Sequence, residues 1–401
     1  MAKYTRSIPE GTRDLLFKEC ETKRAVEKNI VAVFKSRGFS EVITPSFEFY
    51  DVFAEQTNSL PQEMMYKFFD SKGRILVMRP DNTTPIARIT STRLNGFLPP
   101  LRLYYNQNIF RISPSMSGRR DEITQCGLEL IGVRGQKADI EVISTALTIL
   151  KKIAPNDFRL EIGHVGFFKS VIDTLPFDDE VKERVRSFIE SKNYAELKEL
   201  LEPYIRENAS CKALLELPHL FGGREIFELA LRVAPNEETV GTIRYLEMLY
   251  NELCMMGLEK NIMIDLGLVH QIDYYSGVVF RGYMQGSGVA VLYGGRYDSL
   301  FGAFGADLPA TGFAVNVDAV VSNGEFADRS GRPDVLIYSD FSCARKAFEH
   351  MDRLIAEGKV CEMSVFDTLE ESLEYARKKG IGRIDRVDSG IASMDVAPPE
   401  Q

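Results

Sequence analysis

The chain of 401 residues lacks the sequence features of membrane, exported and disulfide-stabilised proteins. No run of about 18 apolar residues occurs, so no membrane-spanning helix is expected. The opening sequence MAKYTRSIPEGTRDLL has no apolar segment of signal-peptide length, and a cytoplasmic location is therefore predicted. The six cysteines are scattered without a Cys-x-x-Cys pair, which argues for reduced thiols and against a zinc site or a disulfide framework.

The sequence also has few basic residues for a nucleic-acid-binding protein. Its 49 lysines and arginines stand against 58 aspartates and glutamates, which gives a formal net charge of −9. Proteins that bind phosphate backbones usually present a basic surface, because binding releases condensed counterions. The acidic balance therefore argues against tRNA binding, although it does not exclude a local basic patch.

The remaining composition predicts a globular protein with a large core. Hydrophobic residues make up 44% of the chain and charged residues 27%, both ordinary values for such proteins. Strand-rich blocks at 102–111, 127–133 and 261–317 flank a charge-dense stretch at about 177–257, in which helical periodicity dominates. Runs of strands and runs of helices in this order predict an α+β fold with an antiparallel sheet rather than a doubly wound fold.

Two helices and a small second domain show clear patterns. Glu19–Arg37 and Asp139–Lys152 each place apolar residues on one face at helical spacing. Near the end of the chain a polar, glycine-bearing linker precedes a β-α-β-α-β unit. The predicted organisation is a core at 1–322, with a helical insertion at about 177–257, and a small C-terminal α/β domain at 333–401.

Three segments carry a family resemblance. They read NIFRISPSMSGRRDEITQCGLELIG (Asn108–Gly132), DLGLVHQIDYYSGVVFRGY (Asp265–Tyr283) and YGGRYDSL (Tyr293–Leu300). All three resemble signature segments of the histidyl-tRNA synthetase family, and the resemblance covers the chain from Ile8 to Val320. It implies a class II aminoacyl-tRNA synthetase-like antiparallel sheet with flanking helices.

Near the start, PEGTRDLL and GFSEVITPSFEFYDVF resemble the opening element and the first motif of that family. Gly38 ends the first helix, and EVITPSFEF is predicted to follow as a β-rich run. In this enzyme class the first motif builds the dimer interface, so the resemblance implies a homodimer formed through GFSEVITP. A plain helix–strand connection, with Pro45 at a strand edge, would explain the same residues.

A histidine-binding site is implied by further matches. Asp81 and Thr83, in RPDNTTPIAR, match a segment that clasps the substrate α-amino group, because two acceptors can converge on an ammonium. The same residues are good turn and helix-capping chemistry, and the two interpretations are compatible. Gln125 and Glu129 lie on one strand face, where Glu129 could accept from an imidazole N–H. Its apolar neighbours predict a buried Glu129, which needs a partner.

Aromatic and basic residues complete the implied site. IDYYSG (Ile272–Gly277) resembles the family's histidine-recognition loop, in which tyrosine hydroxyls and ring faces frame the imidazole. Arg111 matches an arginine that contacts the amino-acid carboxylate and the ATP α-phosphate, a task suited to a planar bidentate donor. The implied histidine-binding residues are Asp81, Thr83, Arg111, Gln125, Glu129, Tyr274 and Tyr275. No catalytic residue, metal or cofactor is implied.

Several charges that adenylation requires are replaced. Ser113 stands where the family has glutamate, and arginine is replaced at Asp121, His270 and Ala319. A carboxylate at 121 would repel a triphosphate, whereas a surface loop freed from ATP binding would tolerate it. His270 is mostly neutral at pH 7 and could be a structural histidine. Loss of a guanidinium that stabilises transition-state charge typically costs orders of magnitude in rate.

These losses favour a resemblance to the regulatory subunits of ATP phosphoribosyltransferase. Such a subunit lacks catalysis of its own, binds L-histidine for feedback control and activates a short-form catalytic subunit in the first step of histidine biosynthesis. The resemblance implies a homodimer within a hetero-octamer, without tRNA or a membrane. The alternative is a divergent, active histidyl-tRNA synthetase that uses Mg²⁺ and ATP and binds tRNA. A synthetase-like paralogue for another small molecule is disfavoured by the retained IDYY and Glu129.

Overall fold

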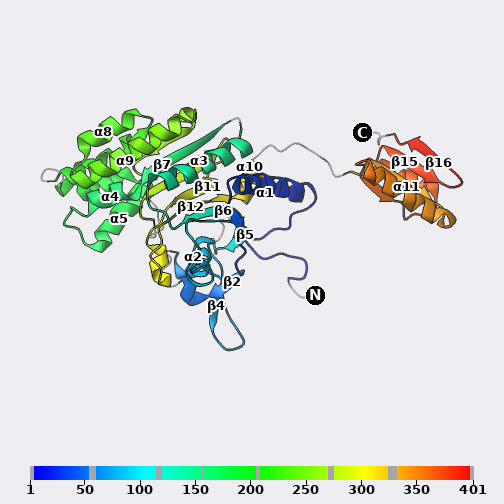
Figure 1. Cartoon of the computed structure of the whole chain (residues 1–401), viewed down its shortest axis with the longest axis horizontal. Coiled ribbons are helices and arrows are strands. Elements are labelled where there is room, and N and C mark those ends of the chain that lie inside the picture. Colours follow the sequence, from blue (N-terminus) through cyan, green and yellow to red (C-terminus); the bar gives the residue numbers. More distant parts are fainter. Residues whose placement is uncertain are drawn as a thin grey trace. The chain divides into compact units, whose positions relative to one another are not determined.

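The structure, a computed structural model, describes residues 4–53, 60–113, 120–155, 157–204, 208–269, 275–323 and 332–397. The chain divides into two compact units, Met1–Phe326 and Ala327–Gln401. The larger unit is built on one broad sheet with helices on its faces, and the smaller is a separate α/β unit (Figure 1). Within the described residues, no helix combines the length and apolar character needed to cross a membrane.

A nine-stranded sheet organises the larger unit, in the order β1-β5-β6-β12-β11-β10-β7-β9-β8. Its strands are β1 Ser40–Glu41, β5 Leu101–Phe110, β6 Glu122–Ile131, β7 Phe158–His164, β8 Phe221–Gly222, β9 Ile262–Asp265, β10 Val278–Met284, β11 Leu292–Arg296 and β12 Ala310–Asn316. The pairs β1–β5 and β7–β9 are parallel, and the others are antiparallel. The predicted α+β class is therefore confirmed, while the predicted antiparallel sheet is mixed.

The strand β6 begins earlier than the sequence pattern predicted. Gly127 was expected to open it, but pairing with β5 already starts at Glu122, opposite Phe110. Polar side chains bond across the two strands here: Asn108 donates to Glu122 at 2.6 Å, and Thr124 donates to Asn108 at 2.7 Å. The polar residues at the start of β6 are thus cross-strand partners.

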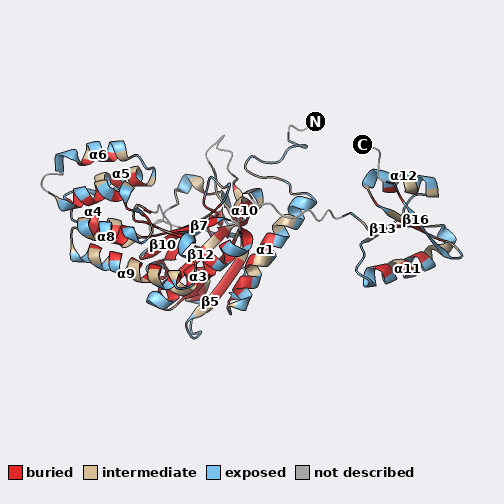
Figure 2. Ribbon diagram, turned by 90° about the horizontal axis from the view of Figure 1, so that it is seen from above, coloured by how far each residue is buried: buried red, intermediate tan, exposed pale blue. Residues whose placement is uncertain are grey.

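Helices cover the two faces of the sheet differently. On one face lie α1 (Lys18–Ser36) and α3 (Gln136–Ile153), and the Phe34 ring of α1 packs 5.5 Å from the Tyr104 ring of β5. On the other face a smaller core joins α2 (Thr83–Thr92) and the 3₁₀ helix η6 (Leu300–Phe304) to alternate β5 residues. Figure 2 shows the buried residues gathered along the strands and the inward helix faces. The two helices α1 and α3 confirm the predicted periodicities, with ends that differ by one to three residues.

The stretch between β7 and β9 is helical apart from the two-residue strand β8. Its helices are α4 Val165–Ile172, α5 Asp179–Glu190, α6 Tyr194–Leu201, α7 Ala209–Glu216, α8 Glu225–Val233 and α9 Glu237–Cys254. Side-chain oxygens of Asp178, Asn193, Asn208 and Asn236 accept from backbone N–H groups at four of the helix starts. Such caps satisfy the orphan donors at a helix N-terminus and place the boundaries of these short helices.

The first-motif region forms a small separate sheet. The expected β-rich run over 41–49 is interrupted at Pro45, which cannot donate to a ladder, so β1 is followed by a second strand, β2 (Phe47–Phe49). This strand pairs with β4 (Ile75–Met78), which also pairs with β3 (Lys67–Phe69). Several large apolar side chains remain exposed on this sheet and just before it, namely Ile43, Phe47, Phe49, Phe68, Phe69 and Ile75.

The smaller unit carries a four-stranded sheet in the order β14-β13-β15-β16. Its elements are β13 Val335–Ser339, α11 Ala344–Ala356, β14 Cys361–Met363, α12 Leu369–Lys379, β15 Arg383–Val387 and β16 Ile391–Asp395. The predicted β-α-β-α-β pattern is present, and β16 was missed because its sequence, IASMD, is short and mostly exposed. Buried Asp385 accepts from Arg383 at 2.7 Å and contacts the His350 ring at 2.7 Å, which ties β15 to α11.

Candidate functional site

The segment that begins α2 is held by a buried arginine. Arg79 donates to the Thr44 and Pro45 carbonyl oxygens at 2.7 and 3.0 Å, and to the Asn108 carbonyl oxygen at 2.7 Å. Three backbone segments are therefore joined at one guanidinium, whose planar fork suits this task. The following residues, Asp81 to Thr83, consequently enter α2 over the face of the central sheet.

Asp81 performs the capping role that its sequence context suggested. Its carboxylate accepts from the Thr84 backbone N–H at 2.8 Å and from the Thr84 hydroxyl at 3.0 Å. Burial raises the pKa of Asp81, while the Thr84 contacts and the nearby Arg111 charge oppose that rise. Arg111 itself donates to the Pro80 carbonyl oxygen at 2.7 Å. Asp81 and Arg111 thus lie together at the start of α2.

Glu129 is the centre of the arrangement. It lies on β6 with 1% of its surface exposed, as its apolar neighbours led us to expect. Thr83 donates to one carboxyl oxygen at 2.9 Å, and the Tyr297 hydroxyl donates to the other. Burial raises the pKa of Glu129 to about 8, because the hydrogen bonds from Tyr297 and Thr83 only partly offset desolvation and the Asp81 charge.

Two more tyrosines lie close to this carboxyl group. Tyr105 and Tyr275 both have a raised pKa, caused first by burial and then by the Glu129 charge. We call Thr83, Tyr105, Glu129, Tyr275 and Tyr297 the Glu129 cluster. It combines a titratable carboxyl group, hydroxyl groups and aromatic faces, a mixture of polar and aromatic groups typical of small-molecule sites.

Glycines on three adjacent strands provide the space for these side chains. Gly312 of β12 is the register partner of Glu129, and a Cβ atom at 312 would overlap the Glu129 carboxyl group. A Cβ atom at Gly127 would overlap the Tyr105 hydroxyl, and one at Gly295 would lie 2.7 Å from the Tyr275 ring. Glycine inside a strand often marks such a close approach.

The sequence analysis did not identify Gly127, Gly312, Tyr105 or Tyr297 as site residues. The signal that could have found them is the strand period of two, which places Tyr105, Gly127, Glu129 and Gly312 on one face of adjacent strands.

The remaining predicted site residues are partly accounted for. Gln125 lies on the same face of β6 and accepts from the Asn82 side-chain amide at 3.2 Å. It is four residues from Glu129, roughly 13 Å along a strand, so the two do not contact each other directly. Tyr274, like His270, lies outside the described residues. The structure therefore joins Thr83, Glu129 and Tyr275 in one cluster, with the other described residues along the start of α2.

The sequence analysis interpreted Asp121 as part of a surface loop that would tolerate substitution, and the structure contradicts this interpretation. It is buried, and its carboxylate accepts from the Ser113 backbone N–H at 2.9 Å and from the Tyr66 hydroxyl. Its own N–H donates to the Gly11 carbonyl oxygen at 2.8 Å. A carboxylate is favoured here because it accepts from both Ser113 and Tyr66, while the backbone N–H of the same residue joins the N-terminal segment to the β5–β6 hairpin.

A second carboxylate meets the basic residue next to Asp121. Asp318 of α10 (Val317–Asn323) accepts from Arg120 at 3.1 Å, from Lys23 at 3.4 Å and from the Thr124 N–H at 2.7 Å. Its neighbour Ala319 has no side chain long enough to reach a nucleotide. Arg120 and Lys23 therefore both lie within ion-pair distance of one protein carboxylate.

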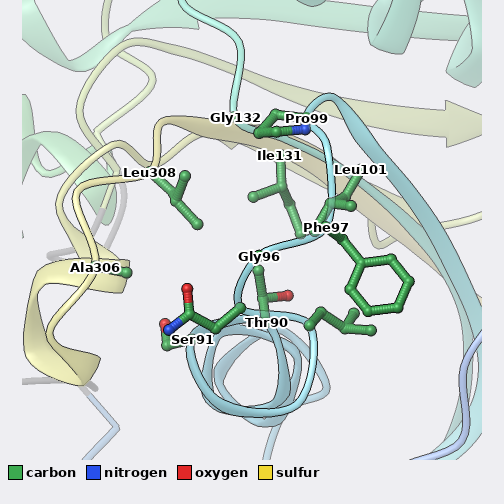
Figure 3. Close-up of a pocket in the computed structure, with 12 residues that line it drawn as sticks. Thr90, Ser91, Gly96, Phe97, Pro99, Leu101, Ile131, Gly132, Ala306 and Leu308 are labelled. Atoms are coloured by element: carbon green, nitrogen blue, oxygen red, sulfur yellow. The ribbon is translucent and has the colours of Figure 1, made fainter.

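A cavity of about 200 Å³ lies at the C-terminal end of α2 (Figure 3), and no residue of the Glu129 cluster lines it. Its lining residues are Thr90, Ser91, Leu94, Asn95, Gly96, Phe97, Pro99, Leu101, Ile131, Gly132, Ala306 and Leu308. None of the predicted site residues lines it. The part of the chain that the structure describes contains no group of three or more His, Cys, Asp or Glu side chains placed to hold a metal ion.

Comparison with known proteins gives consistent matches. The histidyl-tRNA synthetase family profile matches residues 11–320. An "ATP phosphoribosyltransferase regulatory subunit" of Clostridium acetobutylicum is 41% identical over 396 residues, which cover 97% of each chain. A protein of Bacillus mycoides with the same description is 38% identical over 386 residues, which cover 95% of this chain and 91% of the relative.

Solved structures agree with these sequence matches. One from Bacillus halodurans, an ATP phosphoribosyltransferase regulatory subunit/histidyl-tRNA synthetase, has a TM-score of 0.83 and 29% identity, and covers 93% of this chain and 97% of that one. A histidyl-tRNA synthetase from Nostoc has a TM-score of 0.79 at 18% identity, covering 98% and 97% of the two chains, and demonstrates the shared fold alone.

The raised pKa of Glu129 predicts a stability change with pH. Since its folded pKa is about 8 against an ordinary value of 4.5, the folded chain retains a proton that the unfolded chain loses. The resulting stabilisation is complete below pH 4.5 and is lost progressively as the pH rises from 4.5 to about 8. Over this window the free energy of unfolding should fall by up to about 1.4 kcal/mol per pH unit. Glu129→Gln should remove this slope in urea unfolding without ligand. Glu122→Gln, at the other end of β6, is the matched control, and equal slopes in all three proteins would contradict the assignment.

Proposed function

The chain belongs to the ATP phosphoribosyltransferase regulatory subunits, within the wider histidyl-tRNA synthetase family, and from this premise we propose that it binds histidine at the Glu129 cluster. It is a non-catalytic subunit of histidine biosynthesis, and its partner is the catalytic subunit of ATP phosphoribosyltransferase. The proposal extends further: bound histidine signals feedback inhibition, and the partner is a short-form catalytic subunit that needs this chain for activity.

The observation that carries histidine binding is the buried carboxyl group of Glu129, which accepts from Thr83 and Tyr297 and has Tyr105 and Tyr275 close to it. With a pKa of about 8, Glu129 is mostly neutral at pH 7 before a ligand arrives. An imidazole ring could take up its proton, and the result would be a carboxylate–imidazolium hydrogen bond away from water. The hydroxyl groups of Thr83 and Tyr297 already hold the carboxyl group in place, so little reorganisation would be needed.

The charged groups at the start of α2 suit the two ends of an amino acid. The Asp81 carboxylate would attract the α-ammonium group, and the Arg111 guanidinium the α-carboxylate. Their charges already act on each other, since Arg111 opposes the rise in the Asp81 pKa. Gln125, held by Asn82, would supply a further neutral polar contact.

The residues at and beside the positions that match ATP-binding arginines of the synthetases support regulation rather than adenylation. Asp121 and Asp318 are fixed acceptors of protein hydrogen bonds, and their negative charge opposes a triphosphate. Arg120 is paired with Asp318 and is therefore not available without breaking that contact. The alternative, an active histidyl-tRNA synthetase, would require these contacts to be replaced by new ones to ATP.

For assembly, we propose a homodimer through residues 38–49 and the adjoining small sheet, within a hetero-octamer containing the catalytic subunit. Ile43 is 80% exposed, and Phe47, Phe49 and Phe69 are also exposed. Large apolar side chains gathered on one region usually mark an interaction surface. A family-like dimer would cover this region with an obligate interface of at least about 2,000 Å².

Calorimetry should detect L-histidine binding to the chain in complex with the catalytic subunit. Glu129→Gln should weaken binding by about tenfold or more, because a hydrogen bond to a charged group is lost. The ratio of wild-type to variant affinity should also fall above pH 8, where Glu129 no longer carries the proton that the ring would take up. Glu122→Gln should bind like the wild type. Absence of histidine binding by the wild-type complex would overturn the proposal.

The chain should show only background ATP–pyrophosphate exchange in the presence of histidine. Each lost charge contact at a transition state costs about 2–4 kcal/mol, and several are lost here. Combined replacement of Asp121, His270 and Ala319 by arginine should restore little activity, since arginine at 121 would also break the contacts to Ser113 and Tyr66. Exchange at synthetase-like rates in the wild type would support the alternative function instead.

Light scattering at micromolar concentration should give a dimer for the isolated chain. Ile43→Asp together with Phe47→Asp should shift it toward monomer, because two charges would be buried in an apolar interface. Phe341→Asp, at an exposed residue of the smaller unit, is the matched control and should leave the dimer intact. A wild-type monomer would refute this interface.

A further inference from the structure

A buried ion pair joins α3 to β11 beneath the Glu129 cluster. Arg296 is 7% exposed, and its guanidinium donates to both carboxylate oxygens of Asp139 at 3.1 Å. It also donates to the carbonyl oxygens of Val133 and Gly135 at 3.3 and 3.2 Å, and to Asp298 at 3.1 Å. With so many acceptors in a fixed geometry, the position of Arg296 is closely determined.

The backbone that carries Tyr275 is anchored to this arginine. The Ser276 N–H donates to the Arg296 carbonyl oxygen at 2.8 Å, and the Ser276 hydroxyl accepts from the Asp298 N–H at 2.8 Å. Gly277 lies against the aliphatic part of Arg296, since a Cβ atom at 277 would be 2.9 Å from Cδ. The position of Tyr275 in the Glu129 cluster therefore depends on that of Arg296.

The helical stretch between β7 and β9 contacts the same ion pair. Tyr245 of α9 donates its hydroxyl to Asp139, and α3 contacts both α9 and β11 (Figure 1). The His164 ring packs edge-on against Tyr245, with ring centroids 5.6 Å apart. His164 accepts from the Gly166 N–H, and burial lowers its pKa to about 4, so it brings no competing charge at neutral pH.

We propose that Tyr245 is a positioning residue for Tyr275, so that the helices between β7 and β9 set the affinity of the Glu129 cluster through Asp139, Arg296 and Ser276. The Tyr245 hydroxyl orients the Asp139 carboxylate, and this carboxylate fixes the Arg296 side chain. The Arg296 backbone carbonyl in turn accepts from the N–H of Ser276, the residue next to Tyr275. A partner or ligand that shifts α9 would thereby alter the cluster without touching it. The effect on affinity rests on the proposed histidine binding, whereas the positioning of Tyr275 does not.

The first test needs no ligand. Hydrogen exchange of the Ser276 amide is measured in the full-length wild type, in Tyr245→Phe and in Tyr250→Phe. The control removes the hydroxyl of another tyrosine of α9, one that interacts with Cys254 instead of Asp139. Exchange at Ser276 should become about threefold to tenfold faster in Tyr245→Phe, the range typical of coupling through such networks, and should not change in Tyr250→Phe. Equal Ser276 exchange in the two variants overturns the proposal.

The second test measures L-histidine affinity by calorimetry in the same proteins and in Tyr275→Phe. Tyr245→Phe should weaken binding about threefold to tenfold, but less than about twofold when Tyr275 is already phenylalanine, because the hydroxyl that it positions is gone. A purely structural role would give additive losses, and additivity overturns the coupling through Tyr275. A third outcome separates the two proposals. If Tyr245→Phe speeds Ser276 exchange but the wild type binds no histidine, the positioning role is supported and the proposed function is refuted.

Discussion

The candidate site depends on one constraint, the burial of the Glu129 carboxyl group on a sheet face. Its register partner on the neighbouring strand, Gly312, has no side chain. A carboxyl group inside a sheet face needs both room and hydrogen-bond donors, or it would cost several kcal/mol. Gly312 provides the room, and Thr83 and Tyr297 provide the donors. Thr83, at the start of α2, and Tyr297, just before η6, consequently meet at the same carboxyl group, and the other members of the cluster pack beside them.

The sequence was sufficient for the architecture because the strong signals were long and periodic. The amphipathic patterns of α1 and α3 gave both helices, and the IDYYSG and YGGRYDSL segments gave the synthetase-like fold. It was less informative where polar residues have unexpected partners. The pattern located β6 only from Gly127 onward, because the polar residues before it bond to Asn108, which lies on a strand that the pattern alone does not align.

The site was predictable in part for the same reason. Thr83 and Glu129 could be named from a resemblance, but Gly312 and Tyr297 gain their meaning only from register and from a contact across 168 positions of sequence. Asp121 shows the opposite error. Its carboxylate suggested that a constraint had been lost, whereas the structure gives it two hydrogen-bond donors, the Ser113 N–H and the Tyr66 hydroxyl, and a structural role.

That role of Asp121 bears on any attempt to redesign the chain for ATP binding. The Asp121 carboxylate accepts from the Ser113 N–H and the Tyr66 hydroxyl, and its backbone N–H donates to Gly11, so the residue is part of the framework. Arginine at 121 would keep the backbone bond to Gly11 but would lose both carboxylate bonds and leave their donors unsatisfied. A redesign that began at this position would therefore meet a loss of stability first, before any contact to a phosphate could offset it.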